Sequence, residues 1–327
     1  MTEILAVDQA GAFWDDHSAL VSCLREPIPR IPPWYGYDAR GSDLFEDITR
    51  LPTYYLTRVE RGLLDRHSGD IAEAIGGSRI AELGSGSAKK TRVLLQACVA
   101  LRPTTYLPVD VSQEMLHLSA TNLTSEFPGL DVTALWGRYE AGLDWLARNH
   151  HTEPLVVAFL GSNLGNFTAA ERSALLSRIS GTLRSGDGFL VSVDLLKPGQ
   201  TFESCYNDPP GHDAFSDFRL NHLTHLNRRF GADFDLHHFV PRAHWQPAHD
   251  VVAGHLHVTE PHEVTLPELG VRLALEHGDV VNVGFSAKFD RAGLFRELAD
   301  HGLTPQREWT DHDWAYSILL LRRDRVA

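Results

Sequence analysis

The chain has 327 residues, of which 43% are hydrophobic and 9% aromatic, so it can bury a sizeable core. Its formal net charge of −13 disfavours binding to nucleic acid or to an anionic membrane surface. Three scattered cysteines fit neither a disulfide framework nor a zinc site. Because no signal peptide and no long apolar run is recognisable, we expect a cytoplasmic protein with no nucleic-acid or membrane partner.

Short apolar runs alternate with amphipathic segments from about residue 62 to residue 196. The pattern predicts strands at 79–83, 105–110, 131–137, 154–160 and 188–196, and helices at 88–101, 112–124 and 168–184. Strands that alternate with helices in this way indicate a parallel sheet with helices on both faces.

The alternation stops after residue 196 and resumes near the C-terminus. Residues 197–285 contain the adjacent prolines Pro209 and Pro210, many histidines and strand-like segments such as VVAGHLHV (251–258). A helix at 290–302 and strands near 306–309 and 315–323 then complete an α/β, Rossmann-like sheet, predicted to have seven strands and a hairpin at one edge. We therefore expect a core domain from 62–196 and 286–327, and an added α+β substrate-binding domain from 1–61 and 197–285.

The first predicted strand runs into the sequence ELGSG (82–86), and a helical pattern follows. A dinucleotide-binding turn needs a third glycine, but Lys89 occupies that position. The pattern E-x-G-x-G instead resembles folds that bind S-adenosyl-L-methionine (SAM), with the glycines allowing close approach of a ligand to the helix N-terminus. Asp110, at the end of the next strand, can accept hydrogen bonds from both hydroxyls of a ribose. The alternative is an ordinary strand–helix turn with a solvated aspartate.

Two lysines, Lys89 and Lys90, follow the glycines in what the pattern predicts to be the first helical turn. The helix dipole disfavours cations there unless an anion lies nearby. The carboxylate of the methionine part of SAM would be such an anion. Two solvated lysines are the alternative interpretation.

Four segments of the chain resemble the histidine Nα-methyltransferases of the ergothioneine pathway. These are class I SAM-dependent enzymes with an added amino-acid-binding domain, and their relatives include enzymes that N-methylate tryptophan-like amino acids. The resemblance extends from about residue 30 to the C-terminus. The segments are WYGYDARGSDLFEDITRLPTYYLTR (34–58), ELGSGSAKKTR (82–92), FLGSNLGNFT (159–168) and FSAKF (285–289).

The resemblance implies that SAM is the cofactor and S-adenosyl-L-homocysteine the product. It implies that Lys90 contacts the methionine carboxylate and Asp110 the ribose. The segment WGRYEAG (136–142) matches the part that lines the adenine, but Arg138 and Tyr139 stand where the family commonly has an acidic residue followed by an aromatic one. The implied cofactor-binding residues are Gly84, Gly86, Lys90, Asp110, Arg138, Tyr139 and Gly161.

The resemblance also implies a free amino acid as the small-molecule substrate. Asn166 and Tyr206 would anchor its carboxylate, whereas Tyr37 and Tyr54 would border its amine and side chain. Each of these residues taken alone is more often a core ring or a turn former. The implied catalytic residues are Asn166, Tyr206 and Tyr37, and the implied substrate-binding residues are Tyr54, Asn166, Tyr206, Gly254, Gly284 and Ser286.

One position departs from the histidine-specific pattern. Those members place a glutamate two residues before the serine that aligns with Ser286, whereas this chain has Gly284. In a loosely aligned stretch, Gly254 takes the place of a bulky apolar residue of the family. We interpret the two glycines as room for tryptophan or a modified, for example prenylated, tryptophan; a strand bulge or a close backbone crossing is the alternative explanation. A histidine enzyme with a rebuilt side-chain contact is the alternative function.

Ten of the 18 histidines lie between His212 and His262. In the sequence HLH (255–257) two imidazoles share one face of a strand, as in some metal sites, but no further ligands complete a set and no metal is expected. A SAM-binding protein without turnover remains a third hypothesis, because a fold does not guarantee chemistry. We expect a monomer or a weak homodimer.

Overall fold

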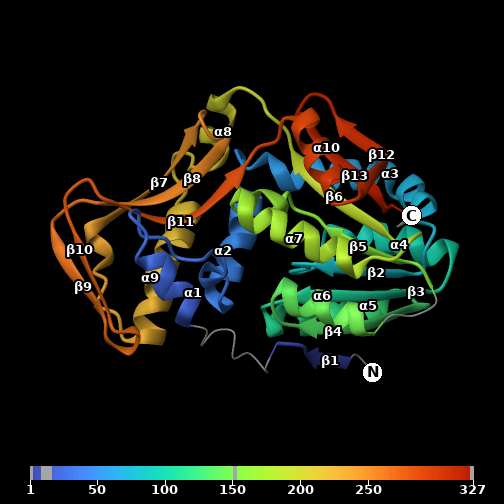
Figure 1. The fold of residues 1–327 in the computed structure, drawn as a ribbon, viewed down its shortest axis with the longest axis horizontal. Coiled ribbons are helices and arrows are strands. Elements are labelled where there is room, and N and C mark those ends of the chain that lie inside the picture. The colour runs from blue at the N-terminus through green and yellow to red at the C-terminus, as the bar shows by residue number, and fades with distance from the viewer. Residues whose placement is uncertain (1–2, 9–16, 150–152, 325–327) are drawn as a thin grey trace. The chain divides into compact units, whose positions relative to one another are not determined.

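The computed structural model describes residues 3–8, 17–149 and 153–324, and its chain divides into two compact units. Figure 1 shows the elements of both. Within the described residues, unit 1 comprises 3–8, 56–149, 153–196 and 288–324, and unit 2 comprises 17–55 and 197–287.

Unit 1 is built on a sheet in which eight strands of the described chain follow the order β1-β4-β3-β2-β5-β6-β13-β12. The first six in this order are parallel, and β13 is antiparallel to both β6 and β12. The bounds are β1 (Glu3–Ala6), β2 (Arg79–Leu83), β3 (Thr104–Asp110), β4 (Leu130–Trp136), β5 (Leu155–Phe159), β6 (Gly188–Asp194), β12 (Leu303–Asp311) and β13 (Tyr316–Arg323).

The predicted α/β sheet and its edge hairpin are confirmed, with one strand more than the seven expected. The additional strand, β1, pairs with β4, and its four residues are too few to show a period in the sequence. Every residue of β2, β5 and β6 is buried, as expected when helices cover both faces of a sheet. The helices of unit 1 are α3 (Tyr55–Ile75, which starts one residue before the unit), α4 (Thr91–Leu101), α5 (Gln113–Glu126), α6 (Tyr139–Arg148), η3 (Asn163–Asn166), α7 (Ala169–Thr182) and α10 (Arg291–Asp300).

Unit 2 combines helices with two small antiparallel sheets, one ordered β11-β8-β7 and the other β10-β9. Leu223, Leu226 and Phe230 of its longest helix pack in one hydrophobic core with Leu256 of β8 and Val264 of β9. The elements are α1 (His17–Leu24), η2 (Pro33–Gly36), α2 (Ala39–Arg50), α8 (Gly199–Cys205), α9 (Ala214–Phe230), η4 (Leu236–His238), β7 (Phe239–Gln246), β8 (Val251–Val258), β9 (His262–Leu266), η5 (Pro267–Leu269), β10 (Val271–Leu275) and β11 (Val280–Ala287).

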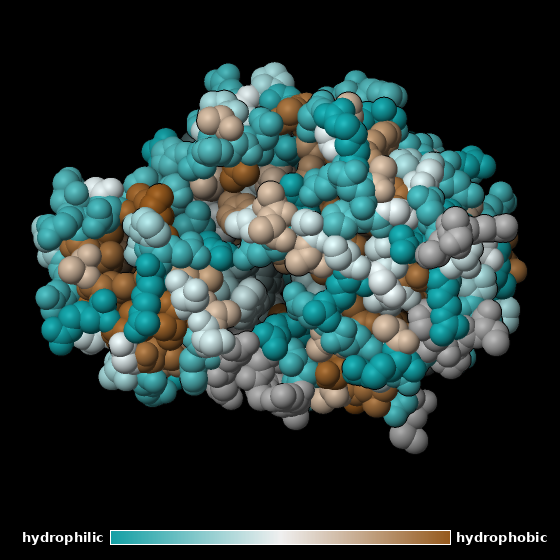
Figure 2. Space-filling view, in the orientation of Figure 1, coloured by the Kyte–Doolittle hydropathy of each residue, from teal (hydrophilic) through white to brown (hydrophobic). Residues whose placement is uncertain are grey.

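On the face drawn in Figure 2, hydrophilic residues predominate and apolar ones form small groups. The most exposed large apolar side chains include Ile28, Leu118 and Val240, which are far apart in the sequence. Among the helices described, none has the length and apolar character needed to cross a membrane. All three cysteines are buried, and none of them forms a disulfide.

Candidate functional site

The turn between β2 and α4 holds both glycines of the E-x-G-x-G pattern in a left-handed conformation. Gly84 has φ +69° and Gly86 has φ +50°, values that residues with a side chain rarely adopt. The Gly86 N–H donates to Oδ2 of Asp110 at 2.8 Å, and the Ser112 N–H donates to Oδ1 at 2.9 Å. The structure therefore brings Asp110 to the glycine turn, and each carboxylate oxygen keeps a lone pair for a further donor.

The glutamate of the same pattern, Glu82, is buried and ties the strand to its neighbours. It accepts a hydrogen bond from the Thr91 hydroxyl at 2.6 Å and a short one from the Tyr106 hydroxyl. Burial raises the pKa of Glu82 to about 7, although both hydrogen bonds and the Lys90 charge oppose this shift. Glu82 thus holds Thr91, the first residue of α4, against strand β2.

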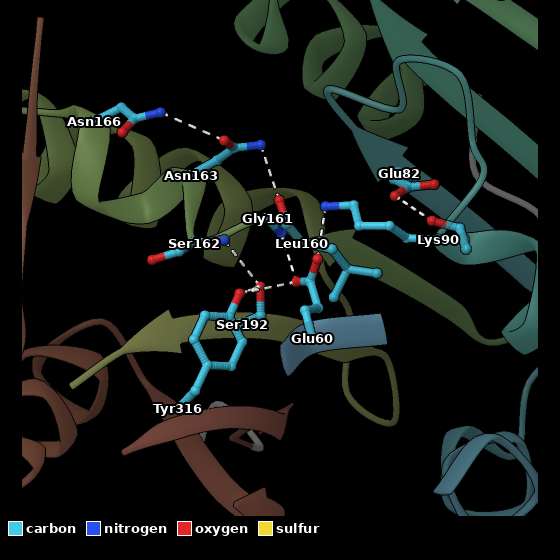
Figure 3. Close-up of polar contacts among 11 residues, drawn as sticks. Glu60, Glu82, Lys90, Leu160, Gly161, Ser162, Asn163, Asn166, Ser192 and Tyr316 are labelled. Carbon is cyan, nitrogen blue, oxygen red and sulfur yellow. Dashed lines mark hydrogen bonds and ion pairs between the residues drawn. The ribbon is translucent and has the colours of Figure 1, made fainter. Parts of the chain in front are cut away.

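Lys90 precedes α4, which begins at Thr91, so the predicted start of this helix at residue 88 is wrong. Ala88, with φ +52°, continues the turn instead. The Lys90 ammonium lies 2.6 Å from a carboxylate oxygen of Glu60, an anion that we did not predict from the sequence (Figure 3). Because an ammonium has three donors, this ion pair leaves Lys90 able to bind a second carboxylate.

Glu60 lies on α3 with none of its surface exposed. It accepts hydrogen bonds from the Gly161 N–H at 2.6 Å and from the Tyr316 hydroxyl at 3.1 Å. Burial would raise the pKa of Glu60, but the Lys90 ammonium, the Ser192 hydroxyl and the Gly161 N–H hold it below its ordinary value. Glu60 therefore links two of the expected cofactor residues, Lys90 and Gly161.

The sequence does contain a signal for Glu60. It stands three and four residues before Leu63 and Leu64, on the apolar stripe of α3, where a charged residue is out of place. A charged side chain on such a stripe needs a partner of opposite charge, which in the structure is Lys90.

The segment expected at the adenine lies beside the turn. The Tyr139 ring packs edge-on against Phe159 at 5.3 Å, and a Cβ at Gly84 would lie 2.9 Å from the Tyr139 hydroxyl. Arg138 instead donates through Nε to the carboxylate of Asp8 at 2.7 Å. An acidic group thus does stand next to this segment, supplied by the residues after β1.

Asn166 ends the short helix η3 that follows β5. Its amide donates to Oδ1 of Asn163 at 3.4 Å, and the Asn163 amide donates to the Leu160 carbonyl oxygen at 2.9 Å (Figure 3). Ser162, in the left-handed region, fastens this loop to the sheet through a hydrogen bond from its N–H to the Ser192 hydroxyl at 3.0 Å. The loop lies at the carboxyl end of β5, the edge at which parallel α/β sheets bind ligands.

Unit 2 gathers several of the expected substrate residues in a cluster of rings, here called the aromatic cluster. The Tyr206 hydroxyl donates to the Ser286 hydroxyl at 2.9 Å, and the Tyr54 and Tyr206 ring centres are 6.1 Å apart. Tyr37 lies 5.2 Å from a ring that the sequence did not single out, Phe218. The aromatic cluster consists of Tyr37, Phe45, Tyr54, Tyr206, Phe215 and Phe218.

The two glycines expected in the side-chain pocket have different surroundings. Gly284 has φ +139° and sits in a bulge of β11, where its N–H donates to Oδ1 of Asn282 at 2.9 Å; a Cβ there would meet no atom within 4 Å. A Cβ at Gly254 would lie 3.2 Å from Nε of Arg219 and 3.4 Å from the Gly284 carbonyl oxygen. Gly284 thus combines a bulge with open space, and Gly254 makes room for an arginine.

Three histidines of unit 2 lie close together on β7 and β8. The Nε2 atoms of His244 and His257 are 3.2 Å apart, and the ring centres of His255 and His257 are 5.9 Å apart. Burial and the two neighbouring imidazoles lower the pKa of His255 to about 4. Within the part of the chain that the structure describes, no group of three or more histidine, cysteine or acidic residues is arranged to hold a metal ion.

A family model for histidine-specific, SAM-dependent methyltransferases matches residues 16–323. The histidine N-alpha-methyltransferase of Mycolicibacterium smegmatis is 36% identical over 327 residues, with 99% of both chains covered. The chain belongs to this family. The methyltransferase is also 34% identical to the Mycobacterium tuberculosis histidine N-alpha-methyltransferase, over 91% of this chain and 92% of the relative. The L-tryptophan methyltransferase of Psilocybe serbica is 28% identical, over 93% and 91%.

SAM is the methyl donor of the methyltransferase, and the residues at the glycine turn fit it. A Cβ at Gly86 would meet no atom within 4 Å, so a ligand has room to approach the backbone there. Asp110 offers acceptors for hydroxyl donors, and Lys90 offers donors for a carboxylate. The fold is that of the class I SAM methyltransferases.

Proposed function

We propose that the methyltransferase transfers a methyl group to the α-amino group of a free amino acid, and that L-histidine is the first substrate to test. The observation that carries the proposal is the Tyr206–Ser286 hydroxyl pair within the aromatic cluster. Two hydroxyls beside apolar rings suit a small zwitterion, because they bind a carboxylate while the rings contact the side chain. Similarity to two histidine N-alpha-methyltransferases over nearly the whole chain supports histidine.

SAM, when bound, supplies an electrophilic methyl group. Lys90 and Asp110 would hold the donor by its carboxylate and its ribose, and Tyr206 with Ser286 would hold the carboxylate of the amino acid. Asn166 remains a proposed substrate contact, since its amide both donates and accepts. The attacking amine must be neutral, and the apolar rings of Tyr54 and Phe215 favour the uncharged form by excluding water. Holding the amine and the methyl group in the right geometry can lower the activation barrier of methyl transfer by a large part. The proposal therefore needs no strong base.

A larger aromatic amino acid such as tryptophan is the second candidate. Gly284 replaces the glutamate that histidine-specific relatives would use for an imidazole N–H, and a Cβ at this position would meet no atom within 4 Å. The similarity to an L-tryptophan methyltransferase is in keeping with this candidate, although it is lower than the similarity to the histidine enzymes.

The test is incubation of the purified protein with radiolabelled SAM and each of the twenty amino acids, followed by chromatography of the products. Methylated histidine supports the first candidate, and product with tryptophan but not with histidine supports the second. SAM binding by calorimetry without product from any amino acid would show a SAM-binding protein with no turnover on these substrates, and would contradict the proposal.

A further inference from the structure

Arg219 on α9 is a buried cation, and one of its nitrogens has no hydrogen-bond partner among the described residues. Its residue is 5% exposed. Nη2 donates to the Tyr206 carbonyl oxygen, and the guanidinium carbon lies 5.0 Å from the centre of the Phe215 ring. Nη1 is buried and makes no hydrogen bond to any residue that the structure describes. A buried donor without an acceptor is costly, and a charged one more so.

No carboxylate in the described chain pairs with Arg219. The acidic group with an electrostatic influence on it is Asp208, whose oxygens accept from the Phe215 and Ser216 N–H groups at 2.8 Å each. Asp208 is thus engaged at the start of α9. Burial lowers the pKa of Arg219 to about 10, so the side chain is positively charged at neutral pH.

The position of Arg219 connects it to the proposed substrate residues of unit 2. It bonds to the backbone of Tyr206, and it lies over Phe215, a ring that also contacts Tyr54 at 5.8 Å. Nε is the atom that a Cβ at Gly254 would approach. Arg219 therefore borders the aromatic cluster on the side of the residues assigned to the substrate side chain.

We propose that Arg219 is a specificity-determining residue whose Nη1 donates a hydrogen bond to an acceptor on the side chain of the amino-acid substrate. This inference rests on the proposed function. A guanidinium has donors and no acceptor, so it recognises carboxylate oxygens, carbonyl oxygens or unprotonated ring nitrogens. It offers no acceptor to an N–H group.

The proposal separates the two candidate substrates. Neutral imidazole has one N–H group and one ring nitrogen that accepts a hydrogen bond. In this chain Arg219 would donate to the accepting nitrogen, in place of a carboxylate that accepts from the N–H group. Unmodified indole has an N–H donor and no acceptor, and it leaves Nη1 unsatisfied.

The experiment compares amino acids that differ by one acceptor. The first pair is L-7-azatryptophan and L-tryptophan, which have the same shape, and the second is L-histidine and 3-(2-thienyl)-L-alanine, whose ring has no nitrogen. Dissociation constants are measured by calorimetry and KM by methyl transfer, for the wild type, Arg219→Met and Arg219→Lys. Arg242→Met, at an exposed position on β7, is the control.

The wild type is expected to favour the acceptor-bearing member of at least one pair by roughly ten- to a hundredfold, as a hydrogen bond to a charged group implies. Arg219→Met abolishes this preference, Arg219→Lys retains part of it, and the control leaves it intact. Absence of a preference in the wild type, or its persistence in Arg219→Met, overturns the proposal. Equal weakening of every amino acid also overturns it, because the α-carboxylate would then be the partner.

A stability measurement excludes a merely structural role. Arg219→Met removes an unpaired buried charge and is expected to raise Tm without ligand, while the rise in Tm caused by the acceptor-bearing amino acid is lost. A lower Tm combined with equal losses for all substrates identifies a structural residue. Failure of the proposed function is distinguishable, since no amino acid would then yield product in either protein.

Discussion

The glycine turn of unit 1 and the aromatic cluster of unit 2 are assembled from different groups. At the turn, the contacts are made largely by backbone N–H groups of Gly86 and Ser112 to one side chain, Asp110. In the aromatic cluster, side chains from α2, α9 and the segment after α8 meet. Few residue types can adopt the backbone conformation of the glycine turn, whereas many side chains can occupy positions in the aromatic cluster. The methyl donor can therefore be predicted from a short motif, whereas the proposed choice of amino-acid substrate rests on single residues such as Gly284 and Arg219.

The largest expected effect concerns the frame of unit 1. Lys288 and Asp194 form an ion pair at 2.8 Å with both side chains fully buried. Asp194→Leu should lower the free energy of unfolding by about 3–5 kcal/mol, because it removes the carboxylate that faces a buried ammonium. Urea unfolding measures this. The double variant Asp194→Leu/Lys288→Met should recover most of the loss, and Asp144→Asn, in an exposed pair with Arg178, should cost less than about 1 kcal/mol. A single variant as stable as the wild type would contradict the role of the pair.

The next effect tests whether Asp110 at the glycine turn binds SAM. Asp110→Ala should weaken SAM binding on the order of a hundredfold, because it removes a charged acceptor and releases the N–H groups of Gly86 and Ser112. Calorimetric titration with SAM gives the dissociation constant. Asp131→Ala, on an exposed position of β4, is the matched control. Unaltered SAM affinity in Asp110→Ala would remove this residue from the donor site.

The third effect concerns residues that are expected to change binding of the amino acid but not of SAM. Tyr206→Phe and Asn166→Ala should each raise the KM for the amino acid roughly tenfold while SAM affinity changes little, because each removes a hydrogen bond to the substrate. Steady-state kinetics at saturating SAM measure KM. Asn122→Ala, at an exposed position of α5, should behave like the wild type. Unchanged kinetics in either variant would exclude that residue from the substrate site.

The smallest effect is a difference in pH dependence between the units. In unit 2, burial lowers the pKa of His222 to about 4, so its contribution to stability is present above its unfolded pKa and is lost as pH falls from about 6.5 to 4. In unit 1, burial raises the pKa of Glu82 to about 7, so its contribution is present below about pH 4.5 and is lost as pH rises to 7.

Each group can change the free energy of unfolding by at most about 1.4 kcal/mol per pH unit. Hydrogen exchange resolved by peptide, between pH 4 and 7, would compare the two units. Glu82→Gln should reduce the pH dependence of stability in unit 1, and His222→Leu should reduce it in unit 2. The quantity compared is the change of stability with pH, not the absolute stability of each variant. Replacement of the exposed His212 is the control. Slopes that are unchanged in both variants would contradict these assignments.

The sequence predicts most of unit 1 because its central strands β2, β5 and β6 are wholly buried and its turn needs glycine. The residues that it misses share a physical cause. Glu60 and Arg219 occupy apolar stripe positions of α3 and α9, and their meaning depends on partners far away in the chain. Lys90 was expected to need an anion, but the protein's own carboxylate, 30 residues earlier at Glu60, was not foreseen. Local patterns locate buried positions, whereas the pairing of charges requires the tertiary structure.

The close approach of Arg219 to Gly254 has a consequence for engineering. A Cβ at 254 would lie 3.2 Å from Nε of Arg219, so a larger residue there requires the guanidinium to move. The residue present at one of these positions therefore limits the side chains that fit at the other. Directed evolution toward new substrates should therefore randomise 219 and 254 together.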